Sequence, residues 1–293
     1  MEHEPLTLLY LAHLNSDHVW QRPQQLMSRF ATRCQVLYVD PPQVVSRDES
    51  LHLQERPGVG AARVIRPIFP ERLTGARERQ LRARQAHTGV QPPLDEPQEG
   101  NFYRRLWLQL LPELLDEVGP NTILWVSSPL ADYLVAAARS RVRLVVYDCM
   151  DDLASFRDGT DDMRRRENNL LKLADLLFTG GYSMYAARKD RHPRAYCFPS
   201  GVDVAHFRRA QAPAIRVPAA VARIARPRLG YFGVLDERID WNLIGEVAAQ
   251  RPDWQWVLVG PFAKVKRSEL PEAPNIHYLG KRAYSRLPGY LKG

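Results

Sequence analysis

The chain has 293 residues, of which 45% are hydrophobic and 25% charged; this is typical of a folded protein with about two domains and argues against disorder. Its formal net charge of +8 favours anionic partners such as nucleotide phosphates or acidic lipid headgroups, although arginine dispersed over a solvated surface explains the charge equally well. The sequence contains no run of the ~18 to 20 apolar residues that span a bilayer, no basic leader, and only three scattered cysteines, so we expect a cytoplasmic protein without disulfides or a zinc site.

The beginning of the chain predicts a β-α-β unit. Residues 6–14 form an apolar run, and Pro23 then opens an amphipathic stretch, as in a buried strand followed by a loop and a helix with Pro in its first turn. A second apolar run at 35–39 predicts the next strand. Residues 43–100 are rich in Arg and Pro and weakly periodic, so here we expect one strand, at 63–68, within long loops.

From residue 101 onward, amphipathic and apolar segments alternate regularly. The expected helices are 101–118, 129–139, 161–173 and 182–190, and the expected strands are 122–127, 142–147, 175–179 and 195–198. Strands that are apolar throughout and separated by single helices predict an α/β fold in which a doubly wound parallel sheet is covered on both faces.

A second domain is expected near the end of the chain. The segment after Phe207 has few aromatic residues and several prolines, which indicates a linker. Strands are then expected at 228–232, 254–259 and 276–279, and helices at 240–250 and 282–291. We therefore expect an N-terminal domain at 1–210, a linker at 211–226 and a C-terminal domain at 227–293. Because independent domains usually have about 100 to 150 residues, we expect this last domain to be incomplete.

The loop between the first strand and the first helix is one candidate site. His18, Trp20, Gln21 and Arg22 precede a helix N-terminus, whose free N–H groups attract anions, and Arg22 would reinforce that attraction. An equally compatible interpretation has Trp20 packed under the sheet edge and Arg22 in a surface ion pair. His13 and His18 with Asp17 match no strong metal-binding spacing, so no metal site is expected.

Three carboxylates follow the strand expected at 142–147. Asp148, Asp151 and Asp152 could bind sugar hydroxyls, act as a general base or hold a divalent cation. The alternative is that Asp151 or Asp152 caps the next helix. We place Asp148 in the ligand cleft and leave the other two open.

The segment from Cys197 to Phe207 carries the most specific pattern. Pro199, Ser200 and Gly201 turn the chain out of a strand, and Val202 and Asp203 follow. This order resembles the signature that closes the N-terminal domain in family 4 of the retaining glycosyltransferases. The resemblance extends over the whole chain except residues 43–100; its other motifs are Trp20-Gln-Arg-Pro23, Ala174-Asp-Leu-Leu-Phe-Thr179 and Leu258-Val-Gly-Pro261. YDCMDD and YFGVLDERID are similar to the branch that contains teichuronic-acid-type envelope polysaccharide glycosyltransferases.

The resemblance implies a GT-B fold, in which two Rossmann-like domains hold a nucleotide-sugar and the second binds its diphosphate. By position, Gly233 lets the backbone approach the phosphates, Arg238 is the diphosphate cation, and Gly260 and Pro261 line the base pocket. Asp148 and His18 become the catalytic candidates. The acceptor-side candidates are Trp20, Gln21, Arg22, Asp151, Ser200 and Gly201.

Two departures from the family pattern affect the donor side. Val234 stands where the family has an Arg, so Arg238 is an approximate substitute. The family's glutamate pair that binds the donor lies beyond Gly293, so we expect weak donor binding and a chain that is inactive on its own.

We expect transfer with retention onto an envelope polysaccharide or lipid-linked acceptor, without metal or cofactor, without nucleic acid, and with peripheral contact to anionic membrane at its inner face. A non-catalytic acceptor-binding or scaffold protein is the alternative. A nicotinamide oxidoreductase is suggested only by Tyr185-x-x-x-Lys189, and the absence of glycine between Leu6 and Phe30 argues against it.

Overall fold

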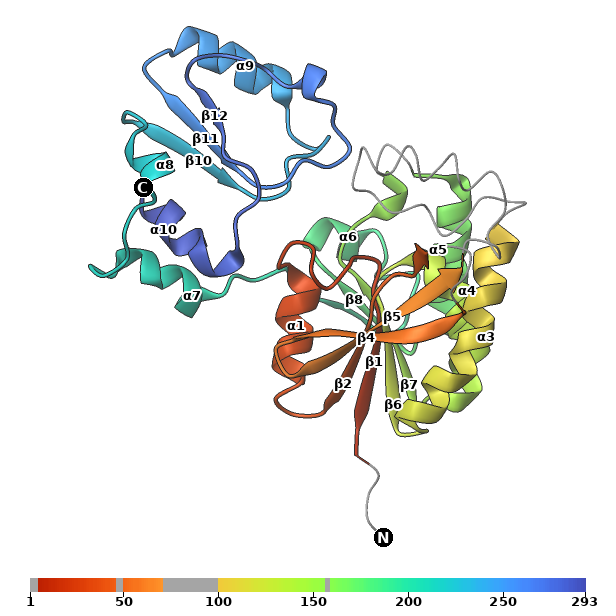
Figure 1. The fold of residues 1–293 in the computed structure, drawn as a ribbon. Helices are drawn as coiled ribbons and strands as arrows, with labels where there is room; N and C mark the ends of the chain where they lie inside the picture. Colours follow the sequence, from red (N-terminus) through yellow and green to blue (C-terminus); the bar gives the residue numbers. More distant parts are fainter. Residues whose placement is uncertain (1–4, 46–49, 71–99, 156–158) are drawn as a thin grey trace. The chain divides into compact units, whose positions relative to one another are not determined.

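The computed structural model describes residues 5–45, 50–70, 100–155 and 159–293. The chain divides into two compact units, and the boundary in the described part of the chain lies between Gly201 and Val202. The two units are described separately below (Figure 1).

The first unit is built on a nine-stranded sheet with the order β3-β5-β2-β1-β6-β7-β8-β9, to which β4 is added on β5. Among the described strands of this sheet, only the β4–β5 pairing is antiparallel. The strands are β1 Thr7–Leu11, β2 Gln35–Val39, β3 Gln43–Val45, β4 His52–Val59, β5 Ala62–Pro70, β6 Thr122–Val126, β7 Leu144–Cys149, β8 Leu176–Thr179 and β9 Ala195–Cys197. The doubly wound parallel sheet expected from the sequence is confirmed.

Helices cover both faces of this sheet (Figure 1). They are α1 Arg22–Phe30, α3 Gly100–Val118, α4 Asp132–Ala138, α5 Asp161–Leu173 and α6 Tyr182–Ala186. Because successive strand residues point to opposite faces, β1 buries Leu9 and Leu11 against the cluster of α3, α4 and α5, and buries Leu8 and Tyr10 on the face that holds Met27 of α1. The apolar runs of the sequence therefore mark strands that are buried on both sides.

The segment at 43–70 differs from its prediction. It forms three strands instead of one, because β4 and β5 make a hairpin at the edge of the sheet and β3 pairs with the end of β5. Most of β4 is partly or fully exposed, so its sequence lacks the apolar run by which the buried strands were recognised. Residues 71–99, for which long loops were predicted, lie outside the described residues.

The second unit has a three-stranded parallel sheet in the order β10-β11-β12. Its strands are β10 Arg228–Phe232, β11 Gln255–Val259 and β12 Ile276–Tyr278, and its helices are α7 Val204–Arg208, α8 Ala219–Ala222, α9 Trp241–Gln250 and α10 Leu287–Lys292. One face packs Leu258 against Trp241 and its neighbours, and the other packs Val257 and Val259 against Tyr290.

The predicted linker at 211–226 is part of this second unit. It contains α8, and its Val221 and Ile224 are buried beside Tyr290. Among the prolines that suggested a linker, Pro213 lies in a turn between two short helices, Pro218 is the N-cap of α8, and Pro227 directly precedes β10. The boundary between units thus falls after Gly201, nine positions before the predicted end of the first domain at residue 210.

Candidate functional site

The carboxyl edge of the first sheet contains a topological switch point. From β1 the chain passes through α1 to β2 on one side, whereas β6 lies on the other side of β1 and leads through α4 to β7. Connections therefore leave β1 and β6 in opposite directions. Crevices at such points are where open α/β sheets bind ligands.

Three polar side chains meet at this switch point. The Tyr10 hydroxyl lies 2.7 Å from Ser127 Oγ, and Ser127 Oγ lies 2.8 Å from His13 Nδ1. Burial lowers the pKa of His13 to about 4 and raises the pKa of Tyr10 above its usual value, so both are neutral at physiological pH. Sequence reasoning considered His13 only as a metal ligand and missed Ser127, although both follow strands that meet at the switch point.

Arg22 and Asp148 form a buried ion pair at the same edge. Arg22 Nε donates to Asp148 Oδ2 at 3.0 Å, and Nη2 donates to Oδ1 at 2.8 Å. The third nitrogen, Nη1, donates to the carbonyl oxygen of Phe198 at 2.6 Å. The two predicted corners are thus brought together, and Arg22 also holds the segment after β9. Because each charge neutralises the other, the pair contributes little net attraction for an anion.

The loop that carries His13 is fixed by a second buried carboxylate. Asp40, which follows β2, accepts from the backbone N–H of Ser16 at 2.7 Å. Arg66 of β5 donates to the same carboxylate through Nε at 3.1 Å and Nη2 at 2.6 Å. Asp40 is fully buried. The edge hairpin is thereby connected to the loop between β1 and α1.

The remaining candidates of that loop lie at the start of α1. Trp20 packs against the apolar face that contains Met27, as the structural interpretation of this residue predicted. Gln21 is the N-cap, and its backbone N–H donates to the side chain of Gln24 at 3.1 Å. His18 is partly exposed, and its backbone N–H donates to the Asn15 carbonyl at 3.1 Å.

The carboxylates after β7 separate into different environments. Asp152 accepts from Arg188 at 3.1 Å and from the Ser155 hydroxyl at 2.9 Å, whereas Asp151 is partly exposed. The turn after β8 approaches this segment closely. A Cβ atom on Gly180 would lie 2.8 Å from the carbonyl oxygen of Met150, so this position requires glycine.

In the second unit, the turns after β10 and β11 touch through their backbones. A Cβ atom on Gly260 would lie 1.6 Å from the Gly233 carbonyl oxygen, and the Gly233 N–H donates to the Val259 carbonyl at 3.0 Å. Pro261 accepts from the Leu235 N–H at 2.9 Å. The predicted donor-side residues Gly233, Gly260 and Pro261 therefore gather at the carboxyl edge of this sheet.

Arg238, the predicted diphosphate cation, lies in the loop between β10 and α9. Its Nη2 donates to Asp236 Oδ2 at 2.7 Å, while 54% of its side chain stays exposed. Asp236 is 12% exposed and its carbonyl accepts from Trp241 Nε1. Asp236 therefore holds Arg238 at the carboxyl end of β10, where about half of its side chain meets solvent.

Ser200 and Gly201 are exposed in the loop that ends the first unit, and a Cβ atom on Gly201 would have no neighbour within 4 Å. The described residues contain no group of three or more His, Cys, Asp or Glu side chains that could hold a metal ion. Within the same residues, no helix is both long and apolar enough to cross a membrane.

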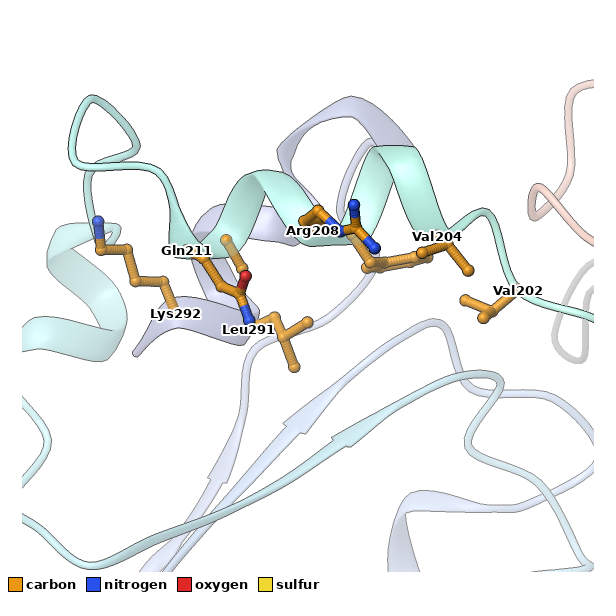
Figure 2. A pocket seen from close by; sticks show the side chains of 8 residues that line it. Val202, Val204, Arg208, Gln211, Leu291 and Lys292 are labelled. Carbon is orange, nitrogen blue, oxygen red and sulfur yellow. The ribbon is translucent and has the colours of Figure 1, made fainter.

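A shallow groove of about 520 Å³ lies within the second unit. Figure 2 shows Val204 and Arg208 on α7 and Leu291 on α10, whose side chains line it. The groove contains none of the predicted site residues. Its lining is mainly apolar, with Arg208, Gln211 and Lys292 as the polar members.

Comparison with known proteins gives one curated relative. Over 210 residues the chain is 25% identical to the "Putative teichuronic acid biosynthesis glycosyltransferase TuaH" of Bacillus subtilis (strain 168). The aligned region covers 65% of this chain and 52% of that protein, so the chain spans about half the length of this relative. No family model matches the chain.

Solved structures share the fold over nearly the whole chain. A trehalose-6-phosphate protein from E. coli bound with UDP-2-fluoro glucose has a TM-score of 0.61 at 12% identity, covering 96% of this chain and 75% of its own. A UDP-forming α,α-trehalose-phosphate synthase from Burkholderia xenovorans in complex with glucose-6-phosphate has a TM-score of 0.62 at 13% identity, covering 96% and 76%. Anabaena HepE in complex with UDP and glucose has a TM-score of 0.55 at 14% identity, covering 97% and 71%.

Proposed function

Given the GT-B fold that this chain shares with those structures, we propose that it is a glycosyltransferase, moving a sugar from a nucleotide-sugar donor to an envelope polysaccharide or lipid-linked acceptor. The observation that carries the proposal is that one fold likeness spans both units, while the curated relative is itself described as a glycosyltransferase. The same likeness does not favour the non-catalytic alternative. The relative's role in teichuronic acid biosynthesis supports an envelope acceptor.

The second unit would bind the donor. The Tyr231 hydroxyl fills the side-chain position of Gly233, and the Gly233 carbonyl fills that of Gly260, so the two backbone turns meet closely at the carboxyl edge of β10 and β11. This is the edge at which open α/β sheets bind ligands, and we place the diphosphate there. Arg238 would then neutralise the leaving diphosphate, which removes the need for a metal ion or a cofactor. UDP-sugars are the donor class to try first, because two of the similar structures hold UDP or a UDP-sugar.

The first unit would bind the acceptor at its switch point. In this proposal Arg22 and Asp148 position the loops after β1, β7 and β9, while His18, Gln21, Asp151, Ser200 and Gly201 lie at or near the edge from which the acceptor enters. We place the protein in the cytoplasm, with peripheral contact to anionic membrane where a lipid-linked acceptor would be met.

Titration calorimetry with UDP-glucose on the purified chain tests donor binding. Arg238→Gln is expected to weaken binding about 10-fold or more, because a charge-assisted hydrogen bond contributes about 1.5 to 3 kcal/mol. Arg251→Gln is the matched control, since Arg251 also pairs with an aspartate two residues away, Asp253, and is 47% exposed. Equal losses in both variants, or no binding of any nucleotide-sugar by the unaltered chain, would contradict the donor site.

Stereochemistry is tested separately. If the chain transfers sugar, proton NMR of the first product formed should show the anomeric configuration of the donor. An inverted product would contradict retention and leave the transfer itself established.

A further inference from the structure

The hydrogen-bond chain at the switch point determines which nitrogen of His13 carries the proton. Tyr10 is only 1% exposed, and among the described residues the hydrogen-bond partner of its hydroxyl is Ser127 Oγ. If Tyr10 did not donate to Ser127, its proton would have no acceptor in a buried place, which is unfavourable. Tyr10 therefore donates to Ser127. Ser127 is itself only 2% exposed, so its own proton also needs an acceptor, and His13 Nδ1 is its other partner among the described residues.

It follows that His13 carries its proton on Nε2. His13 is partly exposed. Some buried side-chain atoms of the described residues have no hydrogen-bond partner, and Nε2 of His13 is not one of them. Nε2 therefore keeps some contact with solvent at the carboxyl edge of β1 and β6, while most of the imidazole is buried. A donor of fixed direction, supported by two buried hydroxyls, is a common arrangement behind a ligand-binding group.

We propose that His13 is a specificity-determining residue whose Nε2–H donates a hydrogen bond to a hydroxyl oxygen of the sugar substrate. The assignment rests on the proposed function and names the group that the first unit would recognise. Sugars present many uncharged hydroxyl oxygens, and a site built to bond one of them discriminates strongly against an analogue that lacks it.

The local charges favour a hydroxyl over a phosphate. The charged groups that act on Tyr10 are Asp148 and Arg22, which influence it in opposite directions and are paired with each other. Burial keeps His13 neutral, since its pKa is lowered to about 4. Binding a phosphate calls for cations, whereas a neutral imidazole N–H suits an uncharged oxygen.

The tautomer is tested by nitrogen-15 NMR on histidine-labelled protein. His13 is expected to be the Nε2–H tautomer and not to titrate between about pH 5.5 and 8.5. Tyr10→Phe removes the donor that orients Ser127, so the Nδ1–H form should become populated. An Nδ1–H tautomer in the unaltered chain, or a midpoint above about pH 6, would overturn the assignment whether or not the chain is an enzyme.

The ligand contact is tested by combining His13 variants with monodeoxy analogues of the sugars that the chain binds. Loss of one particular hydroxyl should weaken binding about 10-fold in the unaltered chain and hardly at all in His13→Ala. His13→Gln, whose amide is also a donor, should recover part of the discrimination. His52→Ala, in the edge hairpin, is the control, and a thermal melt of each variant checks that it is folded.

The outcomes distinguish the two proposals. If the chain binds or transfers sugar, but each deoxy analogue loses the same factor in binding affinity in the unaltered chain and in His13→Ala, the proposed contact is wrong and the proposed function stands. If the chain neither binds nor transfers any sugar, both fail, even where the tautomer is as expected.

Discussion

The ion pair between Arg22 and Asp148 is expected to stabilise the first unit in a strongly non-additive way. Their side chains are only 10% and 4% exposed, and two hydrogen bonds of 3.0 and 2.8 Å join them. Arg22→Met or Asp148→Leu alone leaves one buried charge without its partner, which costs about 3 to 5 kcal/mol. The double variant removes both charges and should lose much less than the sum of the two single losses.

Urea unfolding followed by circular dichroism measures the three variants, with separate transitions fitted for the two units. We expect a coupling energy of about 1 to 3 kcal/mol. Asp161→Asn is the control, because the Arg164–Asp161 pair of α5 has a similar distance of 2.7 Å but is 59% and 99% exposed. It should lose at most about 1 kcal/mol, because Asp161 also lies in the first turn of α5. Single variants that behave like this control, or losses that simply add, would refute the reasoning.

Three further predictions concern other parts of the molecule. Gly260→Ala should destabilise the second unit by at least about 1 to 3 kcal/mol in thermal unfolding, because its Cβ would overlap the Gly233 carbonyl oxygen; unchanged stability would contradict the close approach. The pKa of His13 is about 4 in the folded chain, compared with an ordinary value of 6.5, so the stability contributed by the neutral imidazole is complete above pH 6.5 and is lost as the pH falls through about 4. The loss of unfolding free energy is at most about 3 kcal/mol, and His13→Gln should abolish this pH dependence. Burial raises the pKa of Cys149 to about 11, so at pH 8 iodoacetamide should modify the partly exposed Cys197 first and Cys149 only after unfolding, as mass spectrometry of tryptic peptides would reveal.

The alternation of apolar runs predicted the first sheet well, because strands buried on both faces leave a clear pattern. It also predicted that Arg22 and Asp148 lie at one sheet edge, since each follows a parallel strand. The sequence pattern could not predict that the two side chains pair directly, because the pairing depends on the distance between β1 and β7 across the sheet. Ser127 was missed for a related reason, since a serine after a strand has no distinguishing signal until β6 is known to lie beside β1.

On the donor side, Gly260 was selected through a family resemblance, and the structure supplies a local physical reason for it in the nearby carbonyl of Gly233. The strand at 52–59 was missed because it is largely exposed and lacks an apolar run, and the helix at 219–222 was missed because it has only four residues. The strand at 52–59 is formed by pairing with the neighbouring β5, and the helix at 219–222 packs its Val221 beside Tyr290, which is distant in the sequence; local propensity encodes neither contact.

The carboxylate of Asp40 connects the edge hairpin to the loop that carries His13. Arg66 belongs to the outlying hairpin, yet it shares this carboxylate with the Ser16 amide, three positions from His13. A change at Arg66 would therefore be transmitted to the backbone beside the imidazole. A substitution at the edge of the sheet could therefore change which sugar is accepted while every side chain that contacts the ligand stays the same.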